Sequence, residues 1–104
     1  MQLITKELEE IIPAMYSNSD EDTKLKNMMV YAKLFTPDSN WTWWILRYDK
    51  AERLCFAMVH GLEKELGYVS VDELESVKGP LGLKVERDLH FSPQKYSDIE
   101  ELKC

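Results

Sequence analysis

The sequence predicts a single small α+β domain: an antiparallel sheet of about four strands with an N-terminal helix and a second short, capped helix. Three observations predict this class. Apolar runs suited to strands follow one another between residues 28 and 60 and are separated by turn residues. Helix-start signals flank this region, near residues 5 and 70. The length of 104 residues suits one domain, and we find no internal repeat or boundary.

The first helix is predicted from Lys6 to Ile12. Thr5 is a suitable N-cap, because its hydroxyl can accept a hydrogen bond from a free backbone N–H of the first turn. Apolar side chains recur at helical spacing from Leu8 onward, and Pro13 should end the helix because it lacks a backbone N–H.

Three strands are predicted next, at Met28–Phe35, Trp41–Tyr48 and Arg53–His60, joined by turns at Pro37–Asn40 and Asp49–Glu52. The short connections favour an antiparallel meander. The second strand carries large apolar side chains on both faces, which is typical of a central strand.

The segment LEKEL, residues 62–66, is expected to be a connection that leads to a short strand at Tyr68–Val69. Ser70 and Glu73 then fit a capping box, which predicts a short helix. This helix should end near Lys78 with Gly79 as its C-cap. Residues 85–91 are ambiguous between strand and helix, and the polar residues 94–104 are expected to form a weakly docked tail.

Composition argues against several classes of function. The net charge of −6 and the sequence pI near 4.9 oppose loose binding to nucleic acid or to anionic membranes. No apolar run approaches the roughly 18 residues of a membrane span, and the first residues lack a signal-peptide pattern. We therefore expect a cytoplasmic protein without membrane association.

No known catalytic or cofactor-binding motif is present, so the sequence favours a protein that is not an enzyme and has no cofactor. Cys55 and Cys104 are expected to be free thiols, and no Cys/His spacing predicts a metal site. The two histidines, His60 and His90, are flanked by apolar residues and are interpreted as structural.

Trp41, Trp43 and Trp44 are the first candidates for a binding surface. On a strand, Trp41, Trp43 and Ile45 share one face, whereas Trp44, Leu46 and Tyr48 share the other. One face should be core. The other could be a stacking platform for a base, a sugar or a partner side chain, but core packing under a helix is the favoured interpretation.

The triplet Glu86-Arg87-Asp88 is the second candidate, because three charges inside an apolar frame are costly unless they are paired. In one interpretation Arg87 forms an internal ion pair with a glutamate: Glu63, Glu65 or Glu73. In the other, the triplet and the Trp-lined turn form a polar binding or acid–base site. Asp38 is expected to stabilise its own turn and is included in this candidate site.

Three segments in order, FTPDSNWTWW, GLEKELGYVSVDELESVKGPLGL and VERDLHF, resemble the bacterial domain-of-unknown-function family DUF2958. The N-terminal LITKELEEIIPAMY is also similar, and the resemblance covers residues 2–93. Lys84 stands where members of the family commonly have proline, but the charged triplet is intact. The resemblance implies a small bacterial, plasmid or phage protein, often encoded on mobile elements near genes for DNA transfer or antirestriction. It supplies no catalytic residues.

Our leading hypothesis is therefore a non-enzymatic accessory protein of mobile elements that binds an unidentified protein partner, with antagonism of a defence nuclease as one form. The alternative is a small enzyme or ligand-binding module that uses a polar site. Its candidate residues are Asp38, Trp41, Trp43, Glu86, Arg87 and Asp88. The sequence does not determine the oligomeric state.

Overall fold

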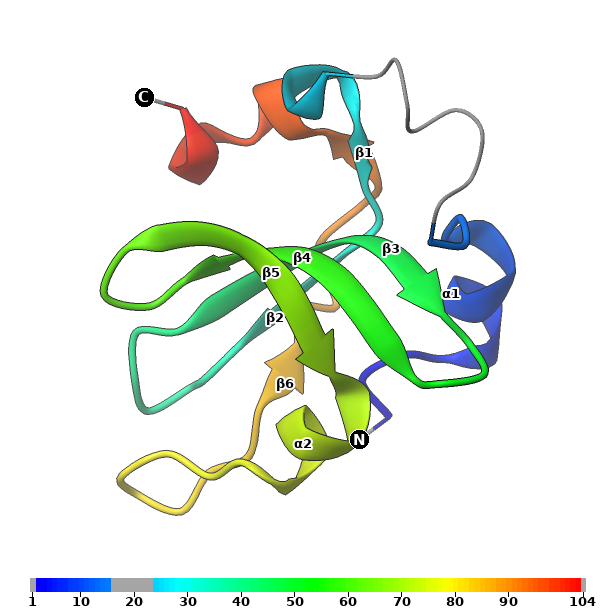
Figure 1. Cartoon of the computed structure of the whole chain (residues 1–104). Helices are drawn as coiled ribbons and strands as arrows, with labels where there is room; N and C mark the ends of the chain where they lie inside the picture. Colours follow the sequence, from blue (N-terminus) through cyan, green and yellow to red (C-terminus); the bar gives the residue numbers. More distant parts are fainter. Residues whose placement is uncertain (1, 16–23, 104) are drawn as a thin grey trace.

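The computed structural model describes residues 2–15 and 24–103 (Figure 1). In these ranges the helices are α1 (Lys6–Ile11) and α2 (Val71–Ser76), and the short 3-10 turns are η2 (Leu25–Asn27), η3 (Tyr96–Asp98) and η4 (Glu100–Leu102). The strands are β1 (Met29–Val30), β2 (Ala32–Phe35), β3 (Thr42–Asp49), β4 (Leu54–His60), β5 (Lys64–Ser70), β6 (Glu86–Arg87) and β7 (Gln94–Lys95). Five strands form an antiparallel sheet in the order β5-β4-β3-β2-β6, and β1 pairs with β7. The α+β class is confirmed.

Both predicted helix N-caps are confirmed. The Thr5 hydroxyl accepts a hydrogen bond from the Leu8 N–H at 3.2 Å, and the Ser70 hydroxyl accepts one from the Glu73 N–H at 3.3 Å. The predicted end of the second helix is wrong. α2 stops at Ser76, and Val77 is its C-cap, with an ordinary negative φ. Gly79 is therefore not the C-cap and has another role.

Two strand predictions need correction. The predicted strand from residue 28 to residue 35 is two strands, because the chain changes partner at Tyr31, from β7 to β3. The predicted connection LEKEL is largely strand, since β5 already begins at Lys64, opposite His60. A tight turn at residues 61–63 closes this hairpin, and charged side chains on its exposed part concealed the strand.

A β-bulge in β3 corrects the predicted faces of that strand. Ile45 pairs with Ala57, but the next paired residue, Arg47, faces Phe56, so Leu46 is an extra residue. The bulge reverses the alternation beyond this point. Tyr48 therefore packs in the same cluster as Ile45, where a regular strand would have placed it on the opposite face.

Two hydrophobic clusters cover the two faces of the sheet. The first includes Leu3, Ile12, Trp43 and Val71, and thus joins α1 and α2 to the sheet. The second includes Trp44, Leu46, Met58, Ile99 and Leu102. Figure 1 shows the C-terminal turns above the sheet and α2 below it.

The prediction of a weakly docked C-terminal tail is wrong. Ile99 and Leu102 are only 3% and 5% exposed, and they complete the second cluster although the residues around them are polar. Among the described residues, none of the helices is long and apolar enough to span a membrane.

Candidate functional site

In the described part of the chain, a groove of about 630 Å³ lies between the β2–β3 turn and the segment that begins with β6. Its volume lies within the range of roughly 300–1,000 Å³ that is usual for ligand sites. Charged, apolar and small polar side chains all line it. They are Lys33, Glu86, Arg87, Asp88 and His90; Phe35, Trp41 and Leu89; and Thr36, Ser39, Asn40 and Thr42.

The pairing of β2 with β6 builds one wall of this groove. Phe35 lies opposite Glu86 and Leu34 opposite Arg87, and the Asp88 N–H donates to the Lys33 carbonyl at 2.9 Å. Because side chains alternate along a strand, Glu86 and Arg87 point to opposite faces. Arg87 turns to the N-terminal segment, where its guanidinium donates to the carbonyls of Gln2 and Leu3.

This arrangement replaces the predicted ion pair of Arg87. Glu63, Glu65 and Glu73 are absent from the salt bridges among the described residues. Arg87 instead holds the first residues of the chain against the sheet through main-chain oxygens. It lines the groove but also has a clear structural role.

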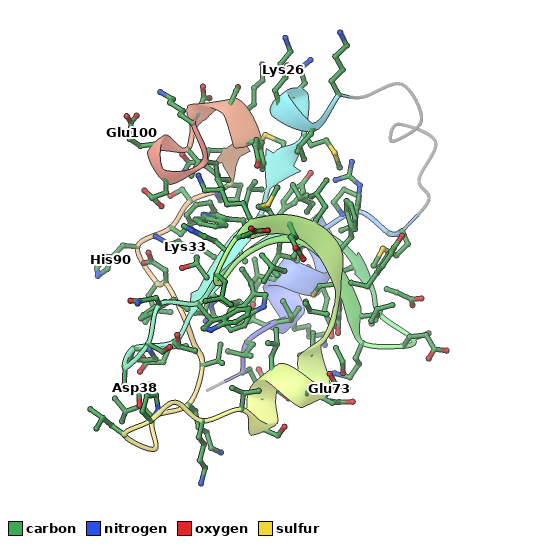
Figure 2. All side chains as sticks on the ribbon, turned by 60° about the vertical axis from the view of Figure 1, so that its left-hand side comes forward. Lys26, Lys33, Asp38, Glu73, His90 and Glu100 are labelled. Carbon is green, nitrogen blue, oxygen red and sulfur yellow. The ribbon has the colours of Figure 1, made fainter. Side chains whose placement is uncertain are left out.

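Lys33 contributes a positive charge to the groove, and two carboxylates partly neutralise it. Its ammonium lies 3.1 Å from the nearest Glu101 carboxylate oxygen and 3.9 Å from that of Asp88. In Figure 2, Lys33 lies between the sheet and the C-terminal segment, and His90 lies further out on the same side. Glu86 is exposed and has no ion pair with the described residues, so its carboxylate is available to a ligand.

Asp88 also shapes the rim of the groove. Its carboxylate accepts a hydrogen bond from the His90 N–H at 2.9 Å, which is a local turn that holds His90 at the rim. His90 is exposed. By contrast, His60 stacks on the buried Trp44, with ring centroids 6.4 Å apart, in agreement with the structural interpretation of that residue.

Trp41 is the tryptophan among the residues that line the groove. Its ring stacks on Trp43, with centroids 6.1 Å apart and an interplanar angle of 24°, yet 42% of Trp41 is exposed. Gly61 lies against the same ring so closely that a Cβ there would clash with it. Trp41 is therefore held in place while part of its surface stays open, which suits a stacking platform.

The structure thus brings together four of the six candidate residues: Trp41, Glu86, Arg87 and Asp88. Trp43 lies beneath Trp41 in the core and is 6% exposed. Asp38 lies outside the groove lining, where its carboxylate accepts hydrogen bonds from the N–H groups of Leu81 and Leu83.

Sequence reasoning missed Lys33, Phe35 and His90 as parts of this site. The β2–β6 register brings Lys33 and Phe35 to the groove, and such long-range pairing leaves no local pattern in the sequence. His90 could have been noticed from its place two residues after Asp88, because an aspartate commonly accepts from the N–H two positions onward.

A second polar cluster lies away from the groove, around Arg53. The guanidinium contacts Asp72 at 2.6 Å and Glu75 at 3.2 Å, which ties the β3–β4 turn to α2. The pKa of Arg53 is raised, mainly by a hydrogen bond with Tyr48 and further by the two carboxylates. Burial is the main cause that raises the pKa of Tyr48. This cluster is structural.

Cys55 is a poor nucleophile. Burial raises the pKa of its thiol to about 12, and the side chain is inaccessible. Cys104 lies outside the described residues. In the ranges that the structure describes, no three His, Cys, Asp or Glu side chains are close enough together to hold a metal ion.

The fold and the groove define a small α+β domain with a mixed polar and aromatic groove. The chain belongs to the family described as "Protein of unknown function (DUF2958)", whose model matches residues 3–98. This match confirms the resemblance inferred from the sequence. Comparisons with curated proteins and with solved structures found no match.

Proposed function

We propose that this protein is a non-enzymatic binding protein of the cytoplasm that recognises its ligand or partner in the groove between residues 36–42 and 86–90. One observation carries the proposal. Trp41, which is 42% exposed, and Glu86, whose carboxylate has no ion pair among the described residues, both line this groove. An aromatic surface beside a free carboxylate suits a ligand that has a planar or apolar group and a hydrogen-bond donor or a positive charge.

The hydrogen bonds around the groove support binding over nucleophilic catalysis. The Thr36 hydroxyl accepts from the Trp41 N–H at 3.0 Å and thereby closes the turn. Among the described residues, no hydrogen bond joins a groove hydroxyl to His90, Glu86 or Asp88. A nucleophile paired with its base would need such a contact in its reactive arrangement.

An accessory role on mobile elements, as the family resemblance implies, fits a protein that acts by binding. In that setting the groove would accept a side chain of a host or element-encoded protein, and antagonism of a defence nuclease would be one result. The acidic surface of a chain with net charge −6 favours association with basic partners.

Binding at the groove can be tested by NMR on isotope-labelled protein, through the signals of its backbone N–H groups. The probe ligands are four amino acid amides (argininamide, lysinamide, tyrosinamide and tryptophanamide), each titrated separately. We expect cationic or aromatic probes to shift signals from residues 36–42 and 86–90. Glu86→Gln should weaken binding of the cationic probes, whereas the matched control Glu10→Gln, on exposed α1, should not.

Two results would reject the proposal. Shifts confined to other parts of the chain would place the binding surface elsewhere. Equal effects of Glu86→Gln and Glu10→Gln would indicate attraction to overall charge rather than recognition in the groove.

The alternative is acid–base catalysis, and one observation favours it: the exposed His90 and Glu86 both line the groove. It predicts turnover of a substrate that His90→Gln and Glu86→Gln each abolish while the protein stays folded. Binding without turnover, with both variants changing affinity alone, would support the proposal of a binding protein.

A further inference from the structure

A second surface of this chain lies along the outer edge of β5 and borders the groove at Trp41. β5 is an edge strand, since it pairs only with β4 among the described residues. An edge strand presents main-chain N–H and C=O groups that can pair with another extended chain. Figure 1 shows β5 curving across the outside of the sheet.

Gly67, in the middle of β5, is required neither by close packing against the described residues nor by its backbone conformation. A Cβ at this position would meet no atom within 4 Å, and the backbone does not have a positive φ. Glycine weakens a strand interior and often marks a place where another backbone approaches closely. The position therefore suits close contact with a partner rather than packing within the domain.

The two faces of this edge differ in character. On the face that includes Trp43, Glu65 lies opposite Val59. Here a hollow of about 340 Å³ is lined by Trp41, Val59, Leu62, Glu63 and Glu65, without a basic side chain.

Neither Glu63 nor Glu65 has an ion pair with the described residues. A cationic side chain in this hollow would meet two carboxylates that have no ion pair among the described residues, and a position over the face of the Trp41 ring would favour it further. On the opposite face of β5, Leu66 and Tyr68 are 44% and 56% exposed, which favours apolar side chains.

We propose that the β5 edge binds an extended basic segment of a partner protein as an added strand, with alternating basic and apolar side chains. The basic side chains enter the hollow at Glu63 and Glu65, and the apolar side chains cover Leu66 and Tyr68. Successive side chains of a strand point to opposite faces, so one extended segment satisfies both surfaces. This surface extends the proposed function, because its carboxylates and its strand edge lie outside the groove lining and recognise a different feature.

The test uses the full chain and a short, dye-labelled, acetylated peptide of alternating arginine and valine. Affinity is measured by fluorescence anisotropy at low salt. We expect Glu63→Gln/Glu65→Gln to weaken binding about tenfold, through loss of two charged contacts. The control Glu10→Gln/Glu52→Gln changes net charge equally at exposed sites and should leave the affinity unchanged. Circular dichroism shows that each variant is folded.

Main-chain pairing is tested with two further peptides, N-methylated at alternate sets of residues. Only the set whose N–H groups face β5 should lose binding, since the other set faces solvent. Absence of binding, an equal loss in both double variants, or equal binding of all three peptides would each overturn the proposal. So would concentration-dependent dimerisation that the peptide does not displace, because the edge would then hold a second copy.

Discussion

The carboxylate of Asp38 occupies the space where a side chain of Gly79 would lie. It accepts hydrogen bonds from the N–H groups of Leu81 at 2.7 Å and Leu83 at 3.3 Å, and a Cβ on Gly79 would clash with its Oδ1. Figure 2 shows Asp38 directed to this loop. Asp38 thus fixes the loop after α2 from the distant β2–β3 turn.

Gly79→Ala should destabilise the protein by about 2 kcal/mol, because the new methyl group must displace the Asp38 carboxylate and its hydrogen bonds. Urea unfolding followed by circular dichroism measures the effect. In an Asp38→Ala background the same substitution should cost far less, since the clash is gone.

Gly67→Ala is the matched control, because a Cβ at Gly67 has open space around it. It should leave the free energy of unfolding unchanged or increase it by about 0.5 kcal/mol, since alanine restricts the unfolded chain more than glycine. Equal destabilisation at both glycines would show that Asp38 is not the cause at Gly79.

Local signals in the sequence were sufficient for the helix starts and most of the meander. The caps at Thr5 and Ser70 depend on side-chain hydrogen bonds three residues away, so a short window of sequence contains the information. Leu46 shows the limit. A bulge depends on how two strands fit together, and the sequence of one strand does not reveal it.

The candidate site was only partly predicted, because it too depends on how distant strands pair. The charged triplet and Trp41 stand out by composition, but their meeting depends on the pairing of β2 with β6, about fifty residues apart in sequence. The partners of Arg87 also lie far along the chain, at the N-terminal carbonyls. Every residue has a main-chain carbonyl, so the sequence does not indicate which carbonyls accept from Arg87. Glutamate side chains were therefore predicted as its partners instead.

Ile99→Ala should destabilise the protein by about 2–4 kcal/mol, because Ile99 is buried in the second cluster and its loss leaves a cavity. Amide exchange in β7 should also become faster, since the C-terminal turns hold that strand in place. Leu62→Ala is the control, because Leu62 is 95% exposed and should change stability by less than about 0.5 kcal/mol. A neutral Ile99→Ala would contradict the packing of this segment.

Arg53 should tolerate glycine better than alanine. Its φ of 52° lies in the left-handed region, where a non-glycine residue costs about 1–2 kcal/mol. Both substitutions remove the contacts with Asp72 and Glu75. The difference in stability between the two variants therefore reports the backbone conformation alone. Thermal unfolding should give Arg53→Gly the higher Tm, and a higher Tm for Arg53→Ala would contradict the left-handed conformation.

Cys55 should make the protein less stable at alkaline pH. Burial raises the pKa of its thiol from 9.0 to about 12 in the folded state, so above pH 9 the unfolded chain releases this proton more readily. The contribution is fully present below pH 9 and is lost as the pH rises toward 12. Between pH 8 and pH 10 the loss is about 1.4 kcal/mol.

Cys55→Ala isolates this effect. The variant should be less stable than the wild type at pH 8 because it lacks the buried sulfur, but its free energy of unfolding should fall less between pH 8 and pH 10. Tyr48, whose pKa burial also raises, contributes to the decline in both proteins. Cys55 is only the smallest cause of this shift, so most of the Tyr48 contribution cancels in the comparison. Urea unfolding at the two pH values measures the difference. Parallel declines in the two proteins would show that the Cys55 thiol is not protected from ionisation in the folded state.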